Sequence, residues 1–385
     1  MLTKNFLPKT ILMVLSTTLA LFCSIPKGKE ERILYFQKEF SSMLEGKENF
    51  KRGQYLISWK GETFQGSFPE GNPNQSFHIA SVGKLFTLSL VKILEEEKRL
   101  RLTDPIHKYL SKDVLDSLFV FEGKDYQKEV TIEQLLDHTS GVADYFESKG
   151  IDGSDFMEVI KSNPQKRFSP LELIAYTQKE QKAAFPPGKG FLYSDTGYIL
   201  LGLIIESVAK ESYEIVLEKK IFLPLGMKAS YMYKRSRPLD VTKENDISPI
   251  FLGAVDVTQF ESVTADWAGG GIVSTTGDLL LFQKALWQGK LFQSAKPIDF
   301  AGKQVFHDGI FYGRGWMTVD YGDLFFLFKG TPLMQGHSGI LSTLCFYNPE
   351  LDLHVIANFG GTEQLETSFR WMLQVVQMVE KMQKQ

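Results

Sequence analysis

The chain has 385 residues and a formal net charge of −3, so it is long enough to bury a large core and shows no basic bias toward nucleic acid. A hydrophobic content of 43% is ordinary for a globular protein. The two cysteines, Cys23 and Cys345, lack metal-ligand spacing, and we expect neither a disulfide framework nor a zinc site.

The first residues have the pattern of an export signal. Two lysines precede the apolar run 11–22, which is too short for a comfortable membrane span, and charged residues follow it. We therefore expect residues 1–24 to be a signal peptide. Cys23 lies in a pattern similar to a bacterial lipoprotein signal, although Phe22 before it is bulky. Lipid attachment at Cys23 and an incidental cysteine both stay open, so the protein is expected in the periplasm or as a membrane-anchored lipoprotein of the cell envelope.

The N-terminal part predicts a helix followed by strands. Apolar residues recur at helical spacing between Glu30 and Glu48. Residues 54–68 alternate in polarity around Gly61 and predict two strands. A short strand is predicted at 77–80, and a long helix is predicted to begin at Ser81 and to run to about Glu97.

The middle of the chain predicts helices, and the last third predicts strands. Thr131 with Gln134, and Ser169 with Glu172, have capping-box spacing. The later segments are strands at 324–329, 341–348 and 353–359, and a closing helix at 364–382. Strands at both ends predict one composite α+β domain over 30–385. Its sheet half would take about 30–95 and 262–385, and a mostly helical insertion would take about 96–261.

A serine followed three residues later by lysine places the amine beside the hydroxyl on a helix. Four such pairs occur: Ser24/Lys27, Ser81/Lys84, Ser89/Lys92 and Ser207/Lys210. Ser24 lies in the targeting segment, and the last two pairs lie inside or at the end of predicted helices. Ser81 begins its helix, where free N–H groups suit a developing oxyanion. Position therefore favours Ser81 as the nucleophile.

Two later segments carry further candidates. Tyr193-Ser194-Asp195 follows a turn and precedes an apolar helix; Tyr193 is either a general acid or base or a tyrosine packed at a loop. Gly336-His337-Ser338-Gly339 is predicted to open a strand through Leu341 and Leu344, along which a substrate can lie. His337 is either a donor to a substrate carboxylate or to Tyr193, or a turn histidine without function. The other five histidines are interpreted as structural or surface residues.

These three motifs, in this order, resemble the serine β-lactamase and penicillin-binding-protein superfamily. The resemblance is greatest to the class C branch, with D-alanyl-D-alanine carboxypeptidases and related esterases. Residues 135–141, 185–202 and 268–275 also resemble family landmarks, so the likeness runs from about Phe77 to Phe359. It implies a β-lactamase/transpeptidase-like fold, with a central antiparallel sheet flanked by helices and an inserted, mostly helical subdomain.

The resemblance implies an exported serine hydrolase that forms an acyl-enzyme intermediate on a peptide, amide or ester bond. Ser81 would be the nucleophile, Lys84 its activator and Tyr193 the proton carrier to the leaving group. Backbone N–H groups of Ser81 and Ile340 would form the oxyanion hole. The residues that would support the substrate are Asp195, His337, Ser338, Gly339 and Ile340. The resemblance implies a small-molecule or peptide substrate, no nucleic acid, no metal and no cofactor.

Two positions depart from the usual family pattern. His337 stands where lysine is usual, which removes a fixed positive charge at neutral pH and argues against an efficient β-lactamase. Asp195 stands where asparagine is usual; if ionised, it would pair with Lys84 and shift proton abstraction toward Tyr193. The acylation base therefore stays open. Carboxypeptidase-like and esterase-like activities on D-amino-acid or ester substrates are favoured, with a class C-type β-lactamase and a catalytically weak envelope binding module as alternatives.

Overall fold

The structure is a computed structural model that describes residues 25–385 apart from 48–49, 51, 245 and 293–303. The expected signal peptide and Cys23 lie outside the described residues. Within the described part, no helix combines the length and the apolar character needed to cross a membrane.

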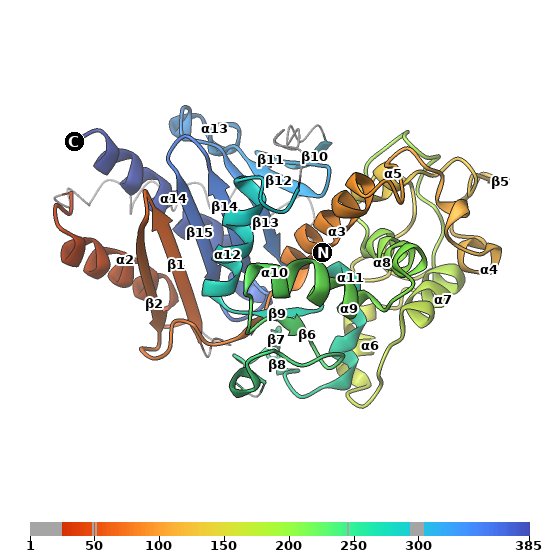
Figure 1. Cartoon of the computed structure of the whole chain (residues 1–385), viewed down its shortest axis with the longest axis horizontal. Coiled ribbons are helices and arrows are strands. Elements are labelled where there is room, and N and C mark those ends of the chain that lie inside the picture. Colours follow the sequence, from red (N-terminus) through yellow and green to blue (C-terminus); the bar gives the residue numbers. More distant parts are fainter. Residues whose placement is uncertain (1–24, 48–49, 51, 245, 293–303) are drawn as a thin grey trace.

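An eight-stranded antiparallel sheet joins the two ends of the chain (Figure 1). Its order is β10-β11-β12-β13-β14-β15-β1-β2, and Leu56 of the N-terminal hairpin pairs with Ile356 near the C-terminus. The strands are β1 (Gly53–Trp59), β2 (Glu62–Phe68), β10 (Gln304–His307), β11 (Ile310–Gly313), β12 (Trp316–Val319), β13 (Met334–Gly339), β14 (Thr343–Asn348) and β15 (Leu353–Asn358). The expected central antiparallel sheet is confirmed.

Both faces of this sheet are covered, which gives the molecule two hydrophobic cores. Helices α2 (Lys29–Leu44) and α14 (Leu365–Gln383) share one core with Tyr55 and Ile57 of β1. Helices α3 (Lys84–Glu96), α8 (Asp195–Ala209) and α12 (Thr276–Trp287) share the other core with Leu56. Because successive side chains of a strand point to opposite faces, every residue of β1 is buried.

A mostly helical region occupies the middle of the chain, with α4 to α8 on the right of Figure 1 and α10, β7 and β8 nearer its centre. Its elements are α4 (Lys112–Leu115), α5 (Ile132–Leu136), α6 (Phe156–Ser162), α7 (Pro170–Glu180), α8, α9 (Tyr213–Leu217), the π-helical η3 (Glu218–Phe222), α10 (Leu223–Leu225) and the short strands β4 (Val120–Phe121), β5 (Lys124–Asp125), β7 (Phe251–Leu252) and β8 (Val255–Asp256). Both predicted capping boxes are present, at Thr131 and at Ser169. The boundaries 96 and 261 for this region stay a prediction.

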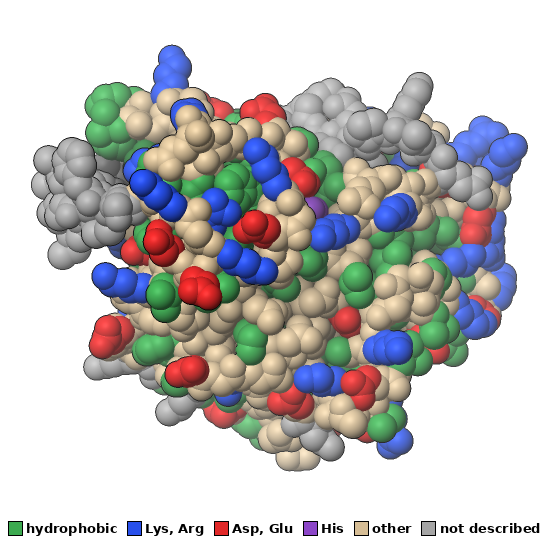
Figure 2. Space-filling model, turned by 60° about the vertical axis from the view of Figure 1, so that its left-hand side comes forward, with side chains coloured by type: hydrophobic (Ala, Val, Ile, Leu, Met, Phe, Trp, Pro, Cys, Tyr) green, Lys and Arg blue, Asp and Glu red, His purple; other side chains and the backbone are tan. Residues whose placement is uncertain are grey.

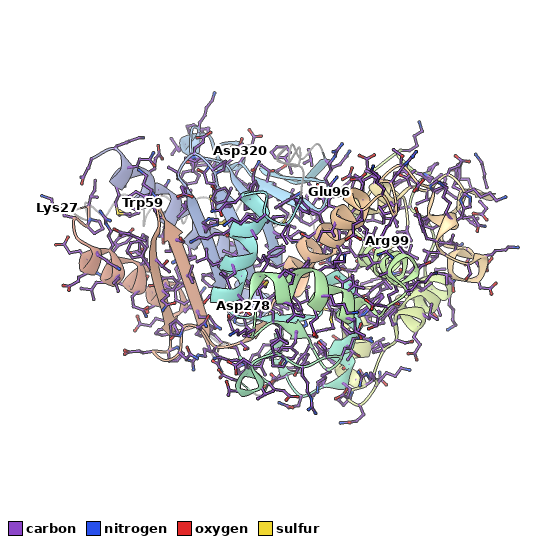
Figure 3. The ribbon with its side chains drawn as sticks, in the orientation of Figure 1. Lys27, Trp59, Glu96, Arg99, Asp278 and Asp320 are labelled. Atoms are coloured by element: carbon purple, nitrogen blue, oxygen red, sulfur yellow. The ribbon has the colours of Figure 1, made fainter. Side chains whose placement is uncertain are left out.

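A small three-stranded sheet connects this region to the large sheet. Its order is β3 (Phe77–His78), β9 (Ile272–Ser274) and β6 (Tyr231–Met232), with α11 (Trp267–Gly270) directly before β9. Asp278 of α12, labelled in Figure 3, accepts hydrogen bonds from the Ala229 N–H and the Ser230 hydroxyl, each at 2.9 Å. These bonds hold residues 229–230, which precede β6, against α12. The middle of the chain also has the 3-10 helices η2 (Ile106–Lys108), η4 (Val241–Lys243) and η5 (Glu261–Asp266), and η7 (Thr362–Gln364) lies just before α14.

The strand predicted at 324–329 is wrong. The segment forms the end of α13 (Tyr321–Leu324) and the 3-10 helix η6 (Phe326–Phe328). Asp320, labelled in Figure 3, accepts hydrogen bonds from the backbone N–H groups of Gly322 at 2.8 Å and Asp323 at 3.3 Å. This cap begins a helical turn in place of a strand.

The strand predicted at 336–339 is present, but its predicted continuation through Leu341 and Leu344 is wrong. Strand β13 ends at Gly339, and the Ser342 N–H donates to the Gly339 carbonyl at 2.9 Å while Ser342 adopts a φ of +59°. The chain therefore turns back into β14.

On the outer surface, Figure 2 shows acidic and basic side chains interspersed over the described part of the face it presents, in keeping with the small net charge.

Candidate active site

Ser81 lies in a 3-10 turn, η1 (Ala80–Gly83), directly after β3. The prediction that it begins the α-helix is wrong, because α3 starts at Lys84. Ala80 has a φ of +46°, a left-handed conformation that L-residues other than glycine seldom adopt. The turn leaves Ser81 partly exposed while its neighbours Ala80 and Val82 are buried.

Lys84 is fully buried and holds three partners. Its Nζ donates to Ser81 Oγ and to the Gly269 carbonyl, each at 3.0 Å, and forms an ion pair with Asp195. Burial lowers the pKa of Lys84, but the charges of Asp195 and Asp266 and the hydrogen bond to Asp195 outweigh this and raise the pKa above its ordinary value. Lys84 is therefore an ammonium that donates to the serine.

Close backbone packing brings the Gly269 carbonyl within reach of Lys84. A Cβ on Gly83 would lie 2.7 Å from Gly270 Cα, so only glycine allows this approach of η1 to α11. One turn further along α3, Thr87 Oγ1 donates to the Ala268 carbonyl at 2.7 Å. Two successive carbonyls of α11 are thus bound by the same face of α3.

Asp195 is the first residue of α8, and Ser194 caps that helix by accepting the Gly197 N–H at 3.3 Å. A carboxylate is stabilised at a helix N-terminus by the helix dipole. The Asp195 N–H donates to Asp144 Oδ1 at 2.8 Å. Burial and the charge of Asp195 raise the pKa of Asp144 to about 8.

Tyr193 lies between these groups, with Lys84 Nζ 4.9 Å from the centroid of its ring. Burial and the charge of Asp195 raise the pKa of Tyr193 well above its ordinary value, and a hydrogen bond with Ser81 offsets only part of this. Tyr193 is consequently a neutral phenol at physiological pH. Both Tyr193 and the ammonium of Lys84 therefore carry a proton that they can donate.

His337 lies in β13 beside this group, with its ring centroid 6.4 Å from that of Tyr193. Its Nδ1 is 2.6 Å from the Ser338 carbonyl and its Nε2 is 3.2 Å from the Tyr312 hydroxyl. Burial and the charge of Lys84 lower the pKa of His337 to about 3. The ring is therefore neutral, donates from Nδ1 and accepts from Tyr312, so it orders the aromatic wall of the site.

The end of β13 abuts the nucleophile turn. Thr343 Oγ1 donates to the Ile79 carbonyl at 2.8 Å, and a Cβ on Gly339 would meet Ala80 Cβ at 2.8 Å. This contact places Ile340 next to the turn that carries Ser81. The Ser338 side chain is buried and donates to Met317 Sδ at 3.4 Å, so it faces the sheet.

The other serine–lysine pairs in the described chain do not form serine–lysine contacts. Ser89 Oγ donates to the Leu85 carbonyl at 2.7 Å, and Lys92 pairs with Glu95. Ser207 Oγ donates to the Tyr109 carbonyl at 2.8 Å. Ser81 with Lys84 is the pair that the fold brings together.

Three residues of the site were missed by sequence reasoning. His138 stacks on Tyr193 at 4.3 Å between ring centroids, and its Nδ1 accepts the Ser194 N–H at 3.0 Å. Asp144 holds the backbone of Asp195, and Asp266 lies in η5 just before α11. His138 belongs to a segment that already resembled a family landmark; nothing in the local sequence marks the two aspartates. In the described part of the chain, no cluster of three His, Cys, Asp or Glu side chains is arranged to hold a metal ion.

Comparisons with known proteins agree with this arrangement. A family model described as Beta-lactamase matches residues 62–368. Penicillin-binding protein 4* of Bacillus subtilis is 29% identical over 259 residues, which are 63% of this chain and 52% of that protein. A putative D-alanyl-D-alanine carboxypeptidase of Escherichia coli O157:H7 is 27% identical over 308 residues, which are 71% of this chain and 66% of that protein. The matches therefore span about half to two thirds of these relatives.

A solved structure of D-amino acid amidase from Ochrobactrum anthropi SV3, complexed with L-phenylalanine amide, has the same fold. Its TM-score is 0.72 at 19% identity, over 91% of this chain and 99% of that one. The β-lactamase/transpeptidase-like fold expected from the sequence is confirmed.

Proposed function

The chain belongs to the beta-lactamase family, and from that premise we propose that it is an exported serine hydrolase that forms an acyl-enzyme intermediate at Ser81. The observation that carries the proposal is the hydrogen bond of 3.0 Å from Lys84 Nζ to Ser81 Oγ, made by a buried amine that Asp195 also holds. A partly exposed hydroxyl with a buried proton relay behind it is what nucleophilic catalysis needs.

In the proposed acylation step, Lys84 takes the proton of Ser81 directly and passes one of its own protons to Asp195. Ser81 Oγ attacks the substrate carbonyl carbon as its proton passes to Lys84 Nζ, and Lys84 passes another proton to Asp195. The new C–O bond leaves an oxyanion, which the N–H groups of Ser81 and Ile340 stabilise. This relay agrees with the raised pKa of Lys84, which leaves little free amine to act as a base by itself.

The leaving group then takes the phenol proton of Tyr193. Lys84 returns a proton to Tyr193, and Asp195 returns one to Lys84, so that the original ion pair is restored. Water repeats the relay on the acyl-enzyme, and Ser81 regains its proton. Because Tyr193 is neutral at rest, its proposed role is that of the acid in this step.

The proposed substrate is an amide, peptide or ester with a D-amino-acid part. Support comes from the relatives named as a putative D-alanyl-D-alanine carboxypeptidase and as a D-amino acid amidase. Export is supported by the signal-like pattern of residues 1–24. Neutral His337 offers no positive charge for the carboxylate of a β-lactam, so efficient β-lactamase activity is not part of the proposal.

Covalent labelling tests this function. Purified protein is treated with a fluorophosphonate and, separately, with a fluorescent penicillin, and adducts are located by mass spectrometry. The wild type and Ser89→Ala, a control from the same kind of sequence pair, should be labelled, whereas Ser81→Ala should not. Labelling by the phosphonate alone would favour the esterase, and no adduct with either reagent would leave the binding-module alternative.

A further inference from the structure

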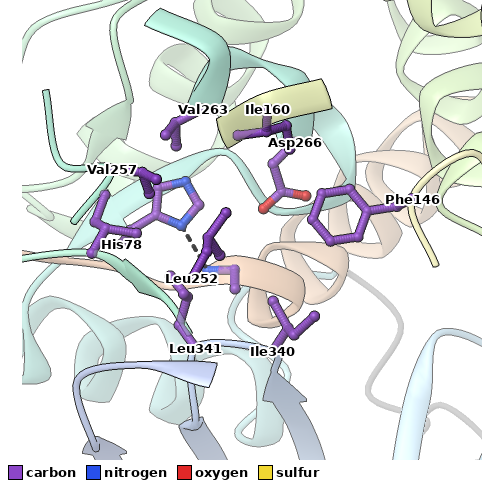
Figure 4. A pocket seen from close by; sticks show the side chains of 11 residues that line it. His78, Phe146, Ile160, Leu252, Val257, Val263, Asp266, Ile340 and Leu341 are labelled. Carbon is purple, nitrogen blue, oxygen red and sulfur yellow. Dashed lines mark hydrogen bonds between the residues drawn. The ribbon is translucent and has the colours of Figure 1, made fainter. Parts of the chain in front are cut away.

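A cavity of about 30 Å³ lies beside the turn that carries the nucleophile (Figure 4). This space holds at least one water-sized group. Ala80, the residue before Ser81, and Ile340, at the end of β13, both line it. The cavity therefore adjoins the point where the acyl part of a substrate would lie. Its wall is apolar except for His78 and Asp266.

Of the two polar side chains of this cavity, His78 has one ring nitrogen without a partner. His78 is 4% exposed, and its Nδ1 accepts the Ala80 N–H at 3.2 Å, the dashed line in Figure 4. The proton of the neutral ring is thus on Nε2, which is buried without a hydrogen-bond partner. The structure gives Asp266 no hydrogen bond or ion pair with any described residue. A polar group bound in this cavity would satisfy the buried Nε2 of His78 and would meet the Asp266 carboxylate.

The position of the Asp266 carboxylate relates it to the reacting centre. A Cβ placed on Gly270 would lie 2.5 Å from both Asp266 Oδ2 and the Ala80 carbonyl oxygen. The carboxylate is therefore next to the backbone that enters Ser81. In an α-aminoacyl group, the amino nitrogen is two bonds from the carbonyl carbon that the serine attacks.

The charges around this carboxylate favour a cation. The carboxylates of Asp195 and Asp266 both act on the ammonium of Lys84, and burial together with the charge of Asp195 raises the pKa of Asp266 to about 7. A bound cation would relieve the repulsion among the carboxylates, whereas an anion would add to it.

We propose that Asp266 binds the free ammonium group of an α-aminoacyl substrate, so that the protein cleaves aminoacyl amides or esters in preference to N-acylated ones. This inference rests on the proposed function and names its substrate class. Asp266 is the residue that sets this preference.

Paired substrates that differ only in the amine provide the test. The rates with D-alanine p-nitroanilide and N-acetyl-D-alanine p-nitroanilide are compared for the wild type, for Asp266→Asn and for Asp113→Asn, a control on the exposed carboxylate of α4. The wild type and the control should prefer the free amine. Asp266→Asn should lose roughly 30-fold or more in kcat/KM for it, mostly through KM, and change little with the acetylated substrate.

Equal rates of the wild type on both substrates would overturn the proposal, as would an equal loss on both in Asp266→Asn. The preference of the wild type for the free-amine substrate is measured without any variant, so the proposal is tested even if Asp266→Asn folds poorly. Binding of D-alaninamide and N-acetyl-D-alaninamide to Ser81→Ala, measured by calorimetry, separates this inference from the proposed function. Tighter binding of the free amine would support the Asp266 site even if the proposed catalytic role of Ser81 is wrong. Equal binding of the two amides would contradict the Asp266 site.

Discussion

Lys84 and Asp195 form an ion pair from which water is almost excluded, with side-chain exposures of 0% and 5%. The two residues belong to different helices, α3 and α8, so the pair joins the nucleophile turn to the helical region. Removal of one partner of such a pair leaves an uncompensated buried charge, which costs more than the pair itself contributes.

Lys84→Met should lower the free energy of unfolding by about 3–5 kcal/mol, because Asp195 is left unpaired. The double variant Lys84→Met/Asp195→Asn should recover at least about 1 kcal/mol of this loss, because the stranded charge is gone. Urea unfolding followed by circular dichroism measures both values. Purely additive effects of the two substitutions would contradict the coupling.

Asp195→Asn should change the pH dependence of acylation. Without Asp195, the largest charge that opposes the effect of burial is gone and Asp266 alone remains, so the pKa of Lys84 falls; the neutral amine is then populated at lower pH, and kcat/KM for an ester should rise with pH. In the wild type Lys84 stays an ammonium, so its pH profile should lack this rise in kcat/KM. The profile is measured with p-nitrophenyl acetate, and superimposable curves for the two proteins would argue against the relay.

Buried His337 should make the protein sensitive to acid. The pKa of its imidazole is about 3 in the folded protein and about 6.5 when unfolded, so between these values the unfolded state binds the extra proton. The stability that His337 contributes is fully present above pH 6.5 and is lost as the pH falls toward 3. About 2 kcal/mol should be lost between pH 7 and 5 through this residue, and His337→Gln should remove that share of the loss in urea titrations.

Gly270→Ala tests the tight packing between η1 and α11. The new methyl would lie 2.5 Å from the Ala80 backbone, which must then move together with Ser81. We expect a loss of about 1–3 kcal/mol in stability and of at least about tenfold in kcat/KM. Gly197→Ala is the control, since its Cβ would meet nothing closer than 3.6 Å, and it should stay within about 1 kcal/mol of the wild type.

Local patterns predicted much of the fold and the centre of the site. Serine and lysine three residues apart meet even across the change from a 3-10 turn to an α-helix, so their contact was readable from spacing. The pairing of Lys84 with Asp195 was anticipated only because a family motif pointed to it. Asp266 could not be found in this way, because its place beside Ala80 depends on how α11 packs against η1.

The sheet was predicted less completely than the helices. Residues 304–319 form three strands that no clear alternation had marked, whereas the apolar run at 324–329 was assigned to a strand. Phe326 is 71% exposed, so an apolar run by itself was a poor guide to burial here. The Asp320 cap, a single side chain, decided the local structure.

The sheet separates the layer that carries Ser81 from the layer in which the described chain ends. Helices α2 and α14 cover the face opposite to α3, so the described chain ends at Gln385 in the layer that does not carry Ser81. A linker added after Gln385 would leave from that layer. Attached through it to a bead or a sensor surface, the protein would be held by the layer opposite to the one that carries Ser81.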